Sequence, residues 1–288
     1  MVEGCWEVWA LAKATAWRVL FSKRMVLLLL VEAMPLWSLL APIGSFVPEL
    51  GYRVGPWLFT FVVGDPVCQA FFSFGVLFLL ADAPFVSSDE AFVLVRAGRL
   101  RWALSRVLAI MLIVAMYYGA LLVLSWLFVA PWMTFAVDGW GVAITTLTET
   151  DAAQSVGITL AFDSAVVGAL APTTALLLTL GFEVVSGVLL GLCIAAVNAF
   201  TGSRAGLAPA AFIVLFDLLV LNVLPHTAFL VSPVSHARIH LLNFAGTSAT
   251  LPSPTDALLF DVSAIAVMGL LAIWAMRRID LGSQMQNQ

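Results

Sequence analysis

Five carboxylates could do chemistry, because they fall within or at the edge of long apolar segments: Glu32, Asp65, Glu183, Asp217 and Asp261. An acid in such a segment is costly in lipid and usually faces a bundle interior, a cavity or a partner. Glu183 and Asp217 either line a polar path that binds a cationic substrate group, or are neutral, hydrogen-bonded packing groups. Packing is favoured for Asp65, Asp217 and Asp261, and the two interpretations of the mid-segment Glu183 are balanced.

A proton relay built on an ion pair would need a lysine or arginine inside one of these segments, and none is expected there. The three histidines offer a second kind of chemistry. His236 and His240 have the i, i+4 spacing of one helix face, with His226 nearby, and paired histidines can bind zinc or copper. No carboxylate or cysteine follows before Asp256, so ordinary external polar residues are expected rather than a metal site. The role of the histidines stays open.

Enzyme motifs are absent from the sequence. The two lysines, Lys13 and Lys23, do not follow glycine, so no Walker-type phosphate loop exists, and neither HExxH nor GxSxG occurs. The chain is not expected to be an enzyme by itself or to bind a cofactor. If nucleotide drives transport, the ATPase is another chain. The remaining enzyme hypothesis is an intramembrane reaction that uses Glu183 and Asp217.

The composition indicates the kind of protein in which these acids and histidines lie. Of 288 residues, 62% are hydrophobic and only 10% are charged, whereas about a quarter are charged in a soluble globule. The sequence therefore predicts one all-α polytopic membrane domain over 1–288. Six spans are long enough to cross the hydrocarbon core. These spans are 25–43, 56–81, 103–130, 172–200, 207–224 and 257–276.

The remaining segments have recognisable patterns. Tryptophan and basic residues over 5–22 predict a helix lying in the membrane interface. Asp65-Pro66 is expected to bend or delay the second span. Gly187 and Gly191 form a GxxxG that favours close helix approach. Apolar pieces within 225–255 predict short external re-entrant or interfacial helices.

Charge placement predicts the orientation. With six spans and the N-terminus inside, eleven basic residues are cytoplasmic, whereas only Arg53 and Arg238 are external. This asymmetry places both termini in the cytoplasm by the positive-inside rule. The cytoplasmic set is Lys13, Arg18, Lys23, Arg24, Arg96, Arg99, Arg101, Arg106, Arg204, Arg277 and Arg278. A lipid membrane is the expected surroundings, and no nucleic-acid partner is expected.

A short charged stretch between the second and third spans predicts a cytoplasmic helix over 87–98. Ser87 and Glu90 have the spacing of a capping box, and Arg96 suits the negative end of the helix dipole. Gly98 is placed to end the helix. About ten residues are too few to cross a bilayer. A helix that contacts a partner and a surface loop helix without one are equally compatible with this pattern.

The order of these elements resembles the permease subunit of bacterial ABC transporters of the type-2 exporter class. The stretch that carries the resemblance most specifically comprises Asp82-Ala83-Pro84-Phe85, Phe92, Val95-Arg96, Gly98-Arg99 and Trp102. The segment Ser232-Pro233-Val234-Ser235-His236 is similar to a serine-proline stretch that such permeases carry before the last span. The likeness covers the whole chain in layout but only these two stretches in motif.

The resemblance implies that the 87–98 helix docks into a separate ATPase subunit, which binds ATP and magnesium. Ser87, Glu90, Phe92, Arg96 and Arg99 would couple the two proteins, with Phe92 as the apolar plug. It also implies a second permease chain, identical or not, and the bacterial cytoplasmic membrane. The substrate is expected to be apolar or amphipathic, such as a peptide, drug or lipid-like molecule. The alternative is a membrane sensor or immunity protein without transport.

Overall fold

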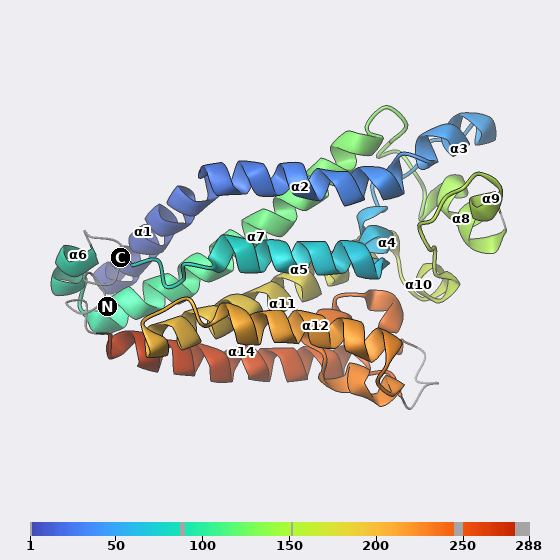
Figure 1. The fold of residues 1–288 in the computed structure, drawn as a ribbon. Helices are drawn as coiled ribbons and strands as arrows, with labels where there is room; N and C mark the ends of the chain where they lie inside the picture. Colours follow the sequence, from blue (N-terminus) through green and yellow to red (C-terminus); the bar gives the residue numbers. More distant parts are fainter. Residues whose placement is uncertain (1, 87–89, 151, 245–249, 280–288) are drawn as a thin grey trace.

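A computed structural model describes residues 2–86, 90–150, 152–244 and 250–279, and this part of the chain is helical without a named β-strand. The longest helices form an elongated bundle (Figure 1). They are α1 (Val2–Leu20), α2 (Lys23–Leu40), α5 (Pro66–Leu80), α7 (Arg99–Val129), α11 (Pro172–Thr201), α12 (Leu207–Asn222) and α14 (Pro254–Arg277). Shorter helices lie at the two ends of this bundle. They are α3 (Ile43–Leu50), α4 (Phe59–Gly64), α6 (Glu90–Ala97), α8 (Gly141–Glu149), α9 (Ala152–Ser155), α10 (Ser164–Ala169), η1 (His226–Val231), α13 (Pro233–His236) and η2 (Ile239–Leu241).

Four helical segments are long and apolar enough to cross a membrane, and they mark the chain as a membrane protein. They run over Lys23–Leu50, Arg99–Val129, Pro172–Thr201 and Pro254–Arg277. The first of them combines α2 and α3. Two further apolar helices, α5 and α12, have 15 and 16 residues and are shorter than a full span.

The segment predicted as the 56–81 span is two helices, because the chain breaks at Asp65. Helix α4 ends at Gly64 and α5 begins at Pro66. The Asp65 carboxylate accepts hydrogen bonds from the backbone N–H groups of Val67 (3.0 Å) and Cys68 (2.9 Å). Asp65 is therefore a helix cap, the packing role favoured for it.

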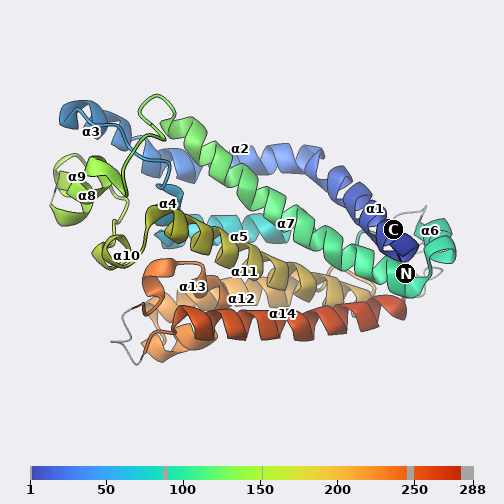
Figure 2. The same cartoon turned by 180° about the vertical axis from the view of Figure 1, so that it is seen from behind.

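Helix α11 is the centre of the bundle, where it packs against α5, α7, α12 and α14 (Figures 1 and 2). A Cβ atom on Gly187 would lie 2.7 Å from Cγ1 of Val114, and one on Gly191 would lie 2.6 Å from Cγ2 of Ile110. Both neighbours belong to α7. The close helix approach that the GxxxG predicts is confirmed, because neither position has room for a larger residue.

Gly187→Ala is expected to lower the free energy of unfolding by about 1–3 kcal/mol, since the added methyl overlaps α7. Gly181→Ala is the matched control in the same helix, because no atom lies within 4 Å of its Cβ position. Its effect should stay within about 1 kcal/mol. Thermal unfolding of the two variants in one detergent measures the difference. Equal stability of the variants would contradict the close packing.

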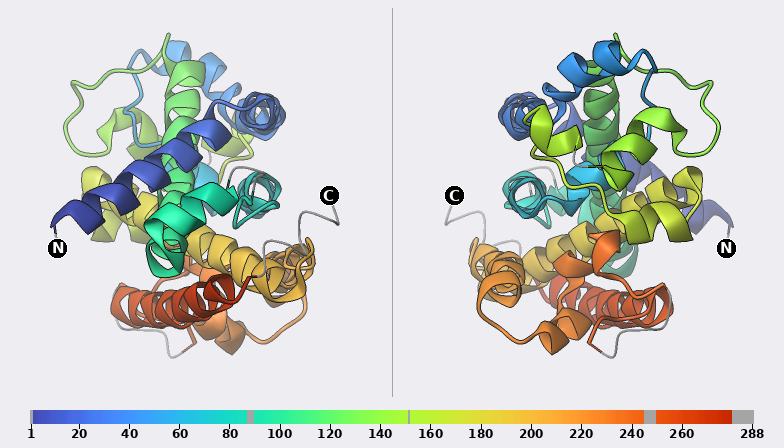
Figure 3. Two further views of the ribbon diagram at one scale, coloured as in Figure 1. Left: turned by 90° about the vertical axis from the view of Figure 1, so that its left-hand side faces the viewer. Right: turned by 90° about the vertical axis from the view of Figure 1, so that its right-hand side faces the viewer.

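The two ends of the bundle differ in charge. Helix α6 and the ends of α1 and α14 lie together at one end, whereas α3, α8 and α10 lie at the other (Figures 1 and 3). At the first end Asp82 pairs with Arg24 and with Arg204, whose Nε is 2.7 Å from Oδ1. Arg101 pairs with Glu7 at 2.8 Å. We call this the basic end and the opposite one the distal end.

Candidate functional site

A buried ion pair lies toward the distal end of the bundle. Arg238 and Asp217 are 0% and 1% exposed, and Nη2 of Arg238 donates to Oδ1 of Asp217. The Ser235 hydroxyl donates to the same carboxylate oxygen at 2.5 Å and also contacts the hydroxyl of Ser232. Asp217 belongs to α12, whereas Arg238 lies between α13 and η2.

This pair corrects the expectation that no basic side chain meets the acids of the bundle. The short helices α13 and η2 fold back onto the end of the bundle and carry Arg238 inward. Val234 and Ile239, which flank it, are also buried. The expectation that the acids lack a matching lysine or arginine is therefore wrong for Asp217. The apolar residues on both sides of Arg238 were the signal in the sequence that this segment is covered.

A second buried pair joins α13 to α14. Nδ1 of His236 is 3.0 Å from Oδ1 of Asp261, and Nε2 is 2.9 Å from the backbone oxygen of Phe229. A carbonyl oxygen only accepts, so Nε2 carries a proton. The contact at Nδ1 joins the imidazole to the Asp261 carboxyl. Asp261 is a hydrogen-bonded packing group, which is the interpretation that the sequence favoured for it. His236 is buried and is therefore not an exposed polar residue.

The histidines are not arranged as a metal site. Helix α13 ends at His236, whereas His240 lies in η2. The prediction that the two histidines share one helix face is therefore wrong. His226 is exposed and stacks on Phe229 with ring centroids 5.7 Å apart. Burial and nearby Arg238 lower the pKa of His240, which favours its neutral form. No three histidine, cysteine or acidic side chains of the described part gather to hold a metal.

Glu183 is the most unusual acid in the bundle. It is 0% exposed in the middle of α11, and neither carboxylate oxygen has a hydrogen-bond partner in the described part of the chain. Tyr118 and Gln69 lie near it, without the geometry of a hydrogen bond, and Arg238 and Asp217 act on it electrostatically. An uncompensated charge here would be very costly, so the geometry favours a protonated carboxyl.

A fourth buried acid, Glu32, belongs to α2. The Tyr117 hydroxyl is 3.3 Å from Oε1 of Glu32 and 3.2 Å from the backbone oxygen of Phe72. Oε2 of Glu32 has no partner among the described residues. A Cβ on Gly75 would lie 2.1 Å from the Tyr117 oxygen, so only glycine fits there. The Glu32–Tyr117 contact was not predicted, because its partners come from three different helices, α2, α5 and α7.

Together these groups form a buried polar seam, which comprises Glu32, Tyr117, Tyr118, Glu183, Asp217 and Arg238. The rings of the two tyrosines lie 5.2 Å apart and connect its halves. The two residues predicted for a substrate path, Glu183 and Asp217, both belong to it. The seam can hold protons or a polar group inside an otherwise apolar bundle.

Glu183→Leu is expected to raise the free energy of unfolding by about 1–3 kcal/mol, because it removes a buried polar group that has no partner. Asp261→Leu is the comparison variant. It removes the hydrogen-bond partner of His236 and should lower the free energy of unfolding by a similar amount. Thermal unfolding in detergent compares the two. If Glu183→Leu destabilises as strongly as Asp261→Leu, the Glu183 carboxyl has a bonding partner in the folded protein.

The predicted coupling residues that the structure describes lie at the basic end, on α6 and at the start of α7. Ser87 lies outside the described residues, as does the side chain of Glu90, at which α6 begins. Phe92 is 76% exposed and Arg96 is exposed. Arg99 lies apart from them, since its Nη1 donates to the backbone oxygens of Arg277 (2.7 Å) and Ile279 (3.1 Å). It holds the end of α14.

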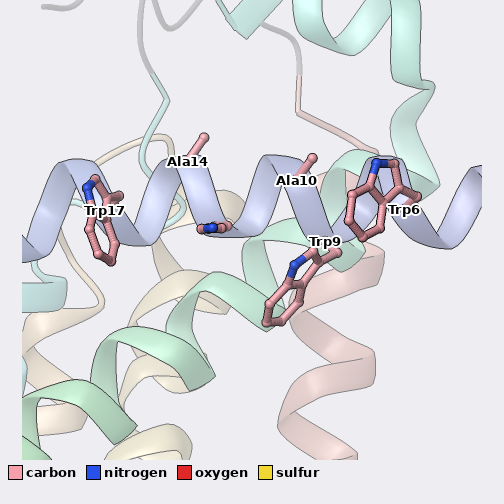
Figure 4. A pocket seen from close by; sticks show the side chains of 6 residues that line it. Trp6, Trp9, Ala10, Ala14 and Trp17 are labelled. Atoms are coloured by element: carbon pink, nitrogen blue, oxygen red, sulfur yellow. The ribbon is translucent and has the colours of Figure 1, made fainter.

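An open groove of about 590 Å³ runs along α1 at the same end of the molecule (Figure 4). Trp6, Trp9 and Trp17 extend from this helix, with Lys13 among them, and Trp6 is 72% exposed. Indole and ammonium groups side by side suit the headgroup region of a bilayer. The predicted interfacial position of this helix stays a prediction.

The fold and the seam define an all-helical membrane protein with ionisable residues buried in its bundle. Comparisons with protein-family models, with curated proteins and with solved structures give no match.

Proposed function

We propose that the chain is the permease subunit of an ATP-driven exporter of the ABC type-2 class. The observation that carries the proposal is α6, a short helix at the basic end with Phe92 76% exposed. An aromatic side chain this exposed, on a helix that also carries the exposed Arg96, is suited to a pocket of another protein. Phe92 would be the plug, and Glu90 and Arg96 would orient it.

The connection of α6 to the bundle supports this role. The N–H of Gly98 bonds to the carbonyl of Leu94, and the N–H of Trp102 bonds to the carbonyl of Gly98. Gly98 has φ +81°, a conformation that favours glycine, and only this residue separates α6 from the 31-residue α7. Helix α7 contacts α1, α11 and α14. A push on α6 would therefore move helices on both sides of the bundle.

The orientation proposed here places the basic end in the cytoplasm of a bacterial cell, with both termini there. Six crossings follow if α5 and α12 also pass through the membrane, α5 together with α4. At 1.5 Å per residue these short helices measure roughly 22–24 Å, less than the usual hydrocarbon core. The short helices η1, α13 and η2 would then be external.

Partners and substrate follow from this class. Two ATPase subunits would supply ATP and magnesium, and a second permease chain, identical or not, would enclose the path. The seam residues Glu183 and Asp217 are the proposed polar points on that path. An apolar or amphipathic substrate such as a peptide, drug or lipid-like molecule suits the surrounding apolar helices.

The test is purification of tagged protein from its native membrane in a mild detergent, followed by an assay of ATP hydrolysis. A co-purifying ATPase is expected. Protein that carries no nucleotide-binding partner and no ATP hydrolysis would overturn the proposal and favour a sensor or immunity protein.

A further inference from the structure

A cavity of about 310 Å³ lies at the distal end of the bundle, between α4, α10, α12 and η2. Its walls are largely apolar, with Phe61 and Phe162 on one side and Leu221 on another. Its polar lining comes from Thr60, Asp163, Arg238 and His240. Small-molecule sites typically have this composition, and the volume is at the small end of their range.

Two residues that line this cavity, Arg238 and Thr60, have unused hydrogen-bonding groups. Arg238 uses Nη2 for Asp217, but its Nε and Nη1 have no partner in the described part of the chain. The hydroxyl of Thr60, 3% exposed, has none either. Buried guanidinium N–H groups are almost always satisfied in folded proteins. These donors therefore point to an acceptor that occupies the cavity, and a ligand oxygen would satisfy them.

The other polar wall has the opposite charge. Oδ1 of the half-buried Asp163 caps α10 by accepting from the N–H groups of Ala165 (2.7 Å) and Val166 (3.3 Å). Oδ2 accepts no hydrogen bond from the described residues. His240, which also lines the cavity, is biased toward its neutral form and does not cancel this charge. The cavity thus has a donor wall at Arg238 and an acidic wall at Asp163.

We propose that this cavity binds a free amino acid with an apolar side chain. Its carboxylate would accept from Arg238 and Thr60, its ammonium group would contact Asp163, and its side chain would lie against Phe61 and Phe162. A simple anion would be repelled by Asp163, and a simple cation would leave the N–H donors of Arg238 without an acceptor. A zwitterion satisfies both walls. The proposal is independent of an ATPase partner.

Equilibrium dialysis of the purified full chain against labelled L-leucine tests the site, with N-acetyl-L-leucine and L-leucinamide as competitors. Saturable binding of leucine is expected. Each derivative lacks one of the two charges, so each should compete at least about tenfold less well. Absence of saturable binding up to about 1 mM leucine, or equal competition by all three compounds, would overturn the proposal.

Two substitutions locate the site without disturbing the Arg238–Asp217 pair. Asp163→Asn keeps the helix cap and removes the charge, so leucine should bind about tenfold more weakly. Thr60→Val should weaken leucine binding about fivefold. Asp138→Asn, an exposed change of the same charge at the same end, is the control. If Asp163→Asn and Thr60→Val both bind leucine like the control, the ligand is not in this cavity.

Discussion

Replacing Arg238 with methionine is expected to lower the free energy of unfolding by about 3–5 kcal/mol. The physical reason is that the Asp217 carboxylate would remain buried without its charge partner. Asp217 is 1% exposed and its described charge partner is Arg238, so the single change strands a charge inside the bundle. Unfolding of the purified protein in detergent, by heat or by added SDS, measures the loss.

The double variant Arg238→Met with Asp217→Leu is the decisive comparison. With both charges removed, neither group is stranded, and stability should return to that of the parent protein or exceed it. A large positive coupling energy between the two sites is the expected outcome of the cycle. If the two losses simply add, the ion pair does not exist in the folded protein.

The double variant also separates structure from function. Buried ion pairs are often no more stabilising than apolar residues of similar volume. That this pair serves function rather than stability is a hypothesis that the double variant tests. If the double variant folds but has lost transport, the pair belongs to the working part of the bundle. If transport persists, its role is confined to the docking of α13 and η2.

The helices could be predicted from the sequence because their signals are local. The segment predicted over 172–200 coincides with α11, where Pro172 occupies the first turn and Gly202, with φ +65°, follows the last residue. The 207–224 segment coincides with α12 to within two residues. Continuous apolar runs between such residues identify helices without tertiary information.

The candidate site was less predictable, because its contacts join distant parts of the chain. Glu183 could be singled out as an acid within an apolar run. Its neighbours could not, since Tyr118 belongs to α7 and Arg238 to an irregular segment. The Arg238–Asp217 pair depends on how that segment folds back, and the periodicity of a helix carries no information about it. The counting of arginines by segment assigned Arg238 to an external segment and could not reveal its pairing with Asp217.

The second large effect concerns Phe92. If the chain is the proposed permease, Phe92→Ala should weaken ATPase binding by at least about thirtyfold, because central aromatic anchors contribute about 2 kcal/mol or more to an interface. The side chain is 76% exposed in this chain, so its removal should leave the stability of the chain nearly unchanged. Co-purified ATPase per permease, and its ATP hydrolysis, are the measurements.

Phe135→Ala is the matched control, since this phenylalanine is 67% exposed but lies beyond α7 at the distal end. Phe92→Leu should restore most of the binding, because leucine keeps an apolar side chain at the same place. Loss of binding in Phe92→Ala, recovery in Phe92→Leu and no loss in Phe135→Ala would show that Phe92 contacts the ATPase rather than stabilising α6. ATPase recovery with Phe92→Ala equal to that with Phe135→Ala would exclude α6 as the docking helix. The exposed phenylalanine would then belong to a lipid-facing surface.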